Sequence, residues 1–314
     1  MKNKKTIMSV SAILILIFHL WINISNCSTE VFLRQLCVVG VDLFFFTSIY
    51  GISKKKELNY KKFIENRFVN VYLKFIILTI IMGIISSWHI DKSLLTLFGI
   101  DLFISGGGSF LWFLPGIMII YILLPIYKKA DTTKPLLTMI LTVLFFLISI
   151  ISISLLTNYK AIFILINRIP IMLIAYYIGK YDIIEKLEKN KILYWTTTLV
   201  LLIIGLIISY NTIINKFTVN WLYDIFYILN IPFELGLILL LNRIKENKIT
   251  NIIGGCTLEL YGLQMMFGFK IVNRLYLKIN NPLITNLCMI IIFVLMAIVL
   301  KYIFECILKQ FNKK

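Results

Sequence analysis

The chain has 314 residues, of which 60% are hydrophobic and 15% are charged, and its mean hydropathy is +0.90. Soluble domains are close to half apolar, so this composition excludes an ordinary soluble enzyme and favours a membrane protein built from several helices. The formal net charge of +17 raises the question of a nucleic-acid partner, but the distribution of basic residues described below argues against one.

Apolar runs of about twenty residues recur along the chain, and each can cross a bilayer core as a helix at ~1.5 Å per residue. The sequence predicts an all-α, polytopic integral membrane protein that forms one domain over residues 1–314. We expect about ten transmembrane helices around a polar intramembrane cavity. The predicted spans lie at about 7–25, 31–52, 69–87, 109–127, 136–157, 161–180, 192–211, 220–241, 252–273 and 282–308.

The lysines and arginines are distributed unevenly between the two ends of these spans. If the N-terminus is cytoplasmic, most of the 32 basic residues fall in segments predicted to be inside. This asymmetry follows the positive-inside rule and explains the basic charge as membrane topology. We therefore predict a multi-pass protein of the cell (plasma) membrane, in contact with lipid, with both termini cytoplasmic and no nucleic acid bound.

The first predicted span, IMSVSAILILIFHLWINIS, carries His19, one of only two histidines in the chain. A polar ring within such a segment is costly unless it faces protein or water. Histidine titrates near neutral pH, so His19 is a candidate general base. The alternative is that His19 only packs by hydrogen bonding to a neighbouring helix.

The second span contains two charged residues, Arg34 and Asp42, eight positions apart. At 100° per residue they lie about 80° apart, on one broad face of a continuous helix. Asp42 is near the middle of the span and needs a partner, a bound cation or a proton. It is either a catalytic carboxylate or part of a structural ion pair with Arg34, Arg168 or Lys74.

The segment KKKELNYKK at residues 54–62, together with Arg67, is predicted to be the most basic cytoplasmic loop. Such a run commonly anchors a protein against anionic lipid. Beside a buried cavity it could instead bind the phosphates of a cytosolic nucleotide-type donor. Both interpretations stay open.

The later spans add further polar residues at membrane depth. Trp112 opens the fourth span at a predicted membrane interface, and Asn167 and Arg168 lie in the sixth. Glu259 and Gln264 lie in the ninth span about 140° apart around the helix, so they need not share a partner. Because packing alone seldom requires so many ionisable groups, we predict a polar cavity between helices.

The five cysteines show no paired spacing, and four of them fall in apolar segments: Cys37, Cys256, Cys288 and Cys306. We expect no disulfide framework and no metal site. The chain also lacks a glycine-rich phosphate loop and a GxSxG motif.

Six stretches, in order, carry a resemblance that runs almost from end to end of the chain. They are SAILILIFHLW, GVDLFFFTSIYGI, FIENRFVNVYLKF, LWFLPGIMIIYILLPI, NRIPIMLIAYYIGKY and TLELYGLQMM. With them the chain resembles the acyltransferase-3 family of polytopic bacterial membrane proteins, which move acyl groups, commonly acetyl, onto cell-surface glycans.

The resemblance implies an O-acetyltransferase with no bound cofactor. Its co-substrate would be an acyl-CoA, with acetyl-CoA favoured, and its acceptor a glycan hydroxyl. Such a reaction needs a base, a group that orients it, and hydrogen-bond donors for the developing oxyanion. We predict that catalysis rests on His19, Asp42 and Glu259. For binding of donor and acceptor we predict Arg34, Arg67, Tyr72, Lys74, Trp112, Asn167 and Arg168.

Three positions depart from the family pattern. Met8 stands where family members typically carry an arginine, eleven residues before the first-helix histidine, and Asn70 replaces the second arginine of a pair that Arg67 begins. Gln264 stands where the family often has histidine. Two alternatives therefore remain: a transporter or flippase of envelope precursors, and a non-catalytic family member that serves an assembly complex.

Overall fold

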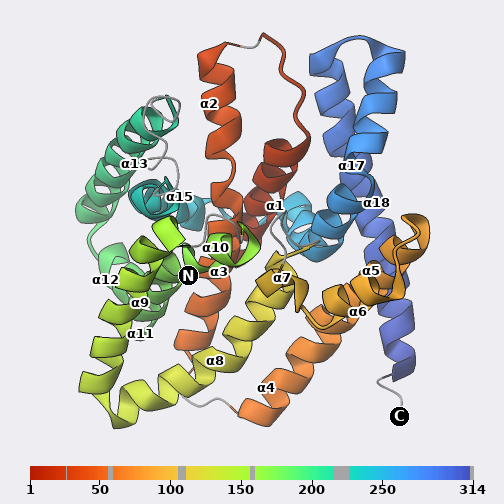
Figure 1. The fold of residues 1–314 in the computed structure, drawn as a ribbon. Coiled ribbons are helices and arrows are strands. Elements are labelled where there is room, and N and C mark those ends of the chain that lie inside the picture. The colour runs from red at the N-terminus through yellow and green to blue at the C-terminus, as the bar shows by residue number, and fades with distance from the viewer. Residues whose placement is uncertain (26, 56–58, 105–110, 156–159, 215–225, 312–314) are drawn as a thin grey trace. The chain divides into compact units, whose positions relative to one another are not determined.

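The computed structural model describes residues 1–25, 27–55, 59–104, 111–155, 160–214 and 226–311, and it contains helices but no strand within these ranges (Figure 1). The all-α prediction is thus confirmed. The chain divides into two compact units, each described here by itself. Unit 1 comprises Met1–Thr47 and Tyr181–Lys314, and unit 2 comprises Ser48–Lys180.

Unit 1 is built around α1 (Lys4–Leu20), which contacts α2, α15, α16, α17 and α18. Its other helices are α2 (Ser28–Leu36), the first part of α3 (Val39–Ser53), α12 (Ile183–Glu188), α13 (Lys191–Ile214), α15 (Ile231–Arg243), α16 (Lys248–Ile253), α17 (Thr257–Ile279) and α18 (Pro282–Phe311).

The last two helices, blue in Figure 1, pack side by side as a hairpin. Helix α17 ends at Asn280, whose φ of 50° is a left-handed conformation that stops helices. Helix α18 begins at Pro282, a residue favoured at the first helical position. These two residues together account for the tight connection.

Unit 2 contains the end of α3 and the helices that follow it. In chain order these are α4 (Tyr60–Arg67), a π-helical turn (Phe68–Tyr72), α5 (Leu73–Ile85), α6 (Ile90–Leu97), α7 (Asp101–Ile104), α8 (Phe113–Thr133), α9 (Pro135–Leu155), α10 (Lys160–Ile166) and α11 (Ile169–Lys180). Helices α8 and α9 form a second hairpin, and α11 packs on α9.

Seven helices among the described residues are long and apolar enough to cross a membrane. Of the other three predicted spans, the first corresponds to α1, which has 17 residues and ends at Leu20. The eighth overlaps residues 215–225, which lie outside the described ranges, and α15. The ninth corresponds to α16 and α17, and the latter carries four charged side chains. The count of about ten stays a prediction, whereas the multi-pass character is supported.

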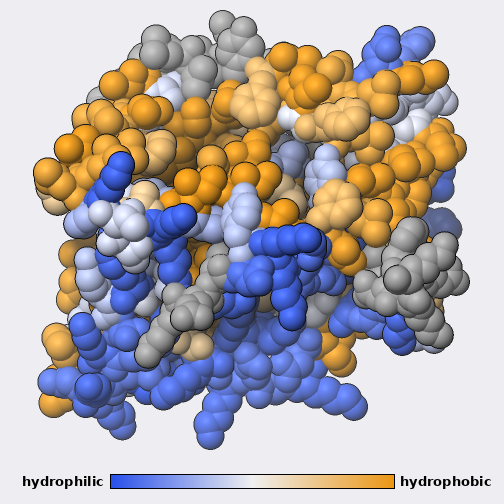
Figure 2. All heavy atoms as spheres, turned by 90° about the horizontal axis from the view of Figure 1, so that it is seen from below, coloured by the Kyte–Doolittle hydropathy of each residue, from blue (hydrophilic) through white to orange (hydrophobic). Residues whose placement is uncertain are grey.

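Large hydrophobic side chains are exposed along several helices. They include Leu136 of α9, Ile192 of α13 and Ile291 of α18, with 60–78% of their surface accessible. Figure 2 shows hydrophobic residues in orange over much of one face, with hydrophilic residues in blue gathered in one part of it. Such exposure is unusual in water and normal in lipid.

The predicted second span corresponds to Ser28–Ser53, which is long and apolar enough to cross a membrane and contains a local irregularity. Cys37 and Val38 separate α2 from α3, and bonds from Val38 N to Gln35 O and from Gly40 N to Cys37 O tighten the chain to three-residue turns. The 80° angle between Arg34 and Asp42 was calculated for a regular α-helix, and these turns lie between the two residues. No proline marks this irregularity in the sequence.

The basic segment is also partly helical, which corrects its prediction as a loop. Asn59 caps α4 by accepting a hydrogen bond from the backbone N–H of Lys62, so Lys61, Lys62 and Arg67 lie on the helix. The π-helical turn joins α4 to α5, and the helix is continuous over Tyr60–Ile85. Residues 56–58 lie outside the described ranges.

Candidate functional site

His19 lies in the last turn of α1 and is half-buried. Its Nδ1 lies 3.0 Å from the carbonyl oxygen of Ile15. A carbonyl oxygen can only accept, so Nδ1 carries the proton in this contact and the lone pair of the neutral ring is at Nε2. The ring of Phe18 meets the imidazole edge-on at 5.0 Å. The first helix thus orients a ring whose second nitrogen is available as a base.

Two helices approach α1 closely because glycine faces it. A Cβ on Gly40 of α3 would lie 2.6 Å from the carbonyl oxygen of Ser11. A Cβ on Gly268 of α17 would lie 2.5 Å from a Leu20 methyl carbon. Small residues commonly permit such contacts between membrane helices.

These two helices carry the buried polar side chains of the candidate site. Asp42 lies in the first turn of α3, and Glu259 lies in the first turn of α17. Both are 1% exposed, and Gln264 of α17 is 2% exposed. The structure therefore places the three predicted catalytic residues, His19, Asp42 and Glu259, in unit 1 on α1 and two helices packed against it.

Arg34, in the last turn of α2, also belongs to unit 1. Its Nη1 donates a hydrogen bond of 3.2 Å to Asn23 Oδ1. Nearby, Glu30 of the same helix accepts hydrogen bonds from Trp21 Nε1 and from the backbone N–H of Ile24. Arg34 thus helps to hold the connection between α1 and α2.

Six predicted binding residues lie in unit 2, and Arg67 and Tyr72 are two of them. The guanidinium of Arg67 lies 5.3 Å from the ring centre of Phe63 and 4.9 Å from that of Tyr121. This double cation–π contact fixes its orientation. The hydroxyl of Tyr72 donates to the carbonyl oxygen of Leu97.

The other four are placed as follows. Asn167 and Arg168, both 1% exposed, occupy the break between α10 and α11, and Asn167 Nδ2 donates to the carbonyl oxygen of Phe163. Lys74 lies in the first turn of α5 and is half-buried. Trp112 directly precedes α8.

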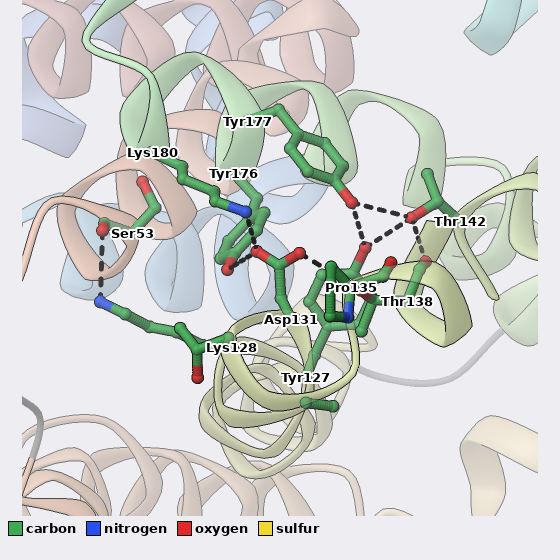
Figure 3. Close-up of polar contacts among 12 residues, drawn as sticks. Ser53, Tyr127, Lys128, Asp131, Pro135, Thr138, Thr142, Tyr176, Tyr177 and Lys180 are labelled. Atoms are coloured by element: carbon green, nitrogen blue, oxygen red, sulfur yellow. Dashed lines mark hydrogen bonds and ion pairs between the residues drawn. The ribbon is translucent and has the colours of Figure 1, made fainter. Parts of the chain in front are cut away.

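Unit 2 also contains an ion pair between buried Asp131 and partly exposed Lys180, which the sequence does not indicate because residues 128–135 are predicted to be a cytoplasmic loop. Asp131, in α8, accepts hydrogen bonds from Lys180 at 2.6 Å, Tyr176 at 2.7 Å and Thr138 at 3.2 Å (Figure 3). The hydroxyl of Tyr127 extends this network to two neighbouring helices by bonding Thr142 of α9 and Tyr177 of α11. No local signal connects residues 49 positions apart.

The chain is similar to a known protein family over nearly its whole length. A family model described as an acyltransferase domain, of the acyltransferase-3 type, matches residues 9–306. No curated protein and no solved structure matches the chain. The match spans both units and includes every predicted site residue.

Proposed function

The chain belongs to the acyltransferase-3 family. From this premise we propose that it transfers an acyl group, with acetyl as the favoured candidate, to a hydroxyl of a cell-envelope glycan. The donor is a cytosolic acyl-CoA thioester. The observation that carries the proposal is His19, a titratable ring on a helix in contact with buried polar helices, with Nε2 as its basic nitrogen. The proposal includes the plasma membrane as the location and cytoplasmic termini.

The proposed reaction has one proton acceptor and one leaving group. His19 Nε2 takes the proton of the acceptor hydroxyl while the hydroxyl oxygen forms a bond to the thioester carbonyl carbon. The C–S bond then breaks, and the imidazolium returns the proton to the departing thiolate. The products are the glycan ester and the free thiol.

Two features of unit 1 support His19 in this role. The ring lies in the last turn of α1, where the partial negative charge of unpaired carbonyls stabilises the positive charge of an imidazolium. Asp42 and Glu259, both buried, supply negative charge on helices packed against α1. Each is proposed to orient or stabilise the ring.

We propose that the donor's phosphates bind the basic segment that includes Lys54, Lys55 and Arg67. Replacing Lys54 and Lys55 by Gln should raise the donor KM severalfold, and the effect should shrink as salt screens exposed charges. Lys189→Gln, at the exposed residue that directly follows α12, is the control. If these replacements leave the donor KM unchanged at low salt, the segment serves only as a topological anchor.

The central test replaces His19 and measures the acyl ester on envelope glycan by mass spectrometry, per molecule of inserted protein. His19→Gln keeps hydrogen bonding but cannot titrate near neutral pH, so ester formation should fall about 10²–10⁴-fold. His19→Ala should fail equally. His89→Ala, at the exposed start of α6, should retain wild-type activity.

If His19 only packs the helix, a different pattern follows. His19→Gln would then keep most of its activity, and His19→Ala would lower protein level and activity together. Near-normal turnover of a well-inserted His19→Gln protein would contradict the assignment of His19 as the general base.

A further inference from the structure

Gln264 is buried in unit 1 without the hydrogen bonds that its amide requires. The side chain is 2% exposed, and neither Oε1 nor Nε2 has a hydrogen-bond partner among the residues that the structure describes. Leaving a buried polar group unsatisfied costs about 1–3 kcal/mol, so such groups call for an explanation. A bound polar ligand would supply one.

Gln264 lies on nearly the same side of α17 as Gly268, the residue that contacts α1. Gly268, four residues later, lies about 40° away around the helix and packs against Leu20. Just before α17, the carbonyl oxygen of Gly254 accepts from Lys5 Nζ at the start of α1. The two helices therefore run parallel. Gln264 precedes Gly268 by about one helical turn, so it lies about one turn closer to the start of α1 than Leu20, the residue that follows His19.

The chemistry around His19 requires a hydrogen-bond donor that the predicted catalytic residues do not provide. A carboxylate such as that of Asp42 or Glu259 can only accept hydrogen bonds, whereas a thioester carbonyl under attack develops negative charge on its oxygen. Among the predicted binding residues that can donate, Tyr72 and Asn167 lie in unit 2 and donate to Leu97 O and Phe163 O. Arg34 lies in unit 1, and its Nη1 donates to Asn23 Oδ1. Gln264 Nε2 is a buried donor in the same unit as His19.

We propose that Gln264 is a catalytic residue whose Nε2–H group donates a hydrogen bond to the acyl carbonyl oxygen during transfer. The inference rests on the proposed acyl transfer. It assigns the stabilisation of the oxyanion to α17 and the base to α1.

The test is Gln264→Met, which keeps the volume of the side chain and removes both polar atoms. Because no hydrogen bond of the resting protein is lost, the melting temperature in detergent should stay the same or rise. The kcat for ester formation should fall about 10²–10³-fold, with a smaller change in donor KM. Gln264→Leu is the second variant and should behave alike.

Asn286 of α18 is the matched control, because both the oxygen and the nitrogen of its buried amide are hydrogen-bonded. It accepts from the backbone N–H of Ile22 at 2.9 Å and donates to the Ile22 carbonyl at 2.8 Å. Asn286→Leu should therefore lower the melting temperature, which Gln264→Met should not.

The outcomes separate the two proposals. A wild-type protein that forms no acyl ester refutes the proposed function. An active wild type with unchanged kcat in Gln264→Met overturns the present inference alone. A drop in melting temperature for both Gln264 variants, matching Asn286→Leu, makes Gln264 a structural amide and also overturns it.

Discussion

At the scale of single residues, Asp131 shows how a charge is held in a largely apolar helix. Its side chain is 4% exposed, and that of Lys180 is 31% exposed. Tyr176 and Thr138 occupy further lone pairs of the carboxylate, as Figure 3 shows. Removing one partner of a buried pair leaves an uncompensated charge, which destabilises more than loss of both.

This pair can be tested by a double-mutant cycle. Lys180→Met should lower the free energy of unfolding by about 1–3 kcal/mol, since partial exposure of Lys180 reduces the full effect of a buried charge. Adding Asp131→Asn to it should restore part of the loss. Lys129→Met, exposed on the same helix, should be nearly neutral. If the stability changes of Lys180→Met and Asp131→Asn simply add in the double variant, as measured by thermal melts, the two residues are not coupled.

At the scale of helices, α13 and α15 of unit 1 pack closely against each other. A Cβ built on Gly205 of α13 would overlap the backbone of Phe233 in α15. Gly236 of α15 faces Leu202 in the same way, at 2.8 Å from its backbone nitrogen. Backbone atoms cannot rotate aside, so the crossing depends on glycine at both positions.

Gly205→Ala should separate these helices and lower stability by about 1–3 kcal/mol. Gly83→Ala in α5 is the matched control, because its nearest neighbour is the movable hydroxyl of Ser93 at 3.1 Å. There the better helix propensity of alanine should offset the contact. Equal melting temperatures of the two purified variants would show that α13 and α15 do not require this close approach.

At the scale of the whole molecule, the orientation in the membrane can be read from two exposed cysteines, Cys27 and Cys306. We predict Cys27 outside and Cys306 near the cytoplasmic face. In single-cysteine variants, a membrane-impermeant thiol reagent added to intact cells should label Cys27 and spare Cys306. The reverse pattern contradicts the proposed topology.

The pH dependence of this labelling is a check on the local structure. A hydrogen bond from Ser25 Oγ and the backbone N–H of Glu30 lower the pKa of the Cys27 thiol below its ordinary value. More thiolate is therefore present at neutral pH, and labelling should become half-maximal at a lower pH than for an unperturbed thiol. Ser25→Ala should move that midpoint upward.

The sequence by itself determined the membrane class, the helical fold and the family. The length and hydropathy of a segment are local properties. In lipid an apolar run forms a helix, because a helix satisfies its backbone hydrogen bonds internally. The order of short motifs, from the His19 helix to TLELYGLQMM, sufficed to recognise the family that the match over residues 9–306 confirmed.

Only the tertiary structure decided how polar groups are partnered. Hydropathy does not distinguish a helix face that meets protein from one that meets lipid, since both are apolar. It therefore missed the bond from Lys180 to Asp131, the irregularity at Cys37 and Val38, and the buried amide of Gln264 that lacks a partner. The bond from Lys180 to Asp131, for example, joins residues 49 positions apart, which only folding brings together.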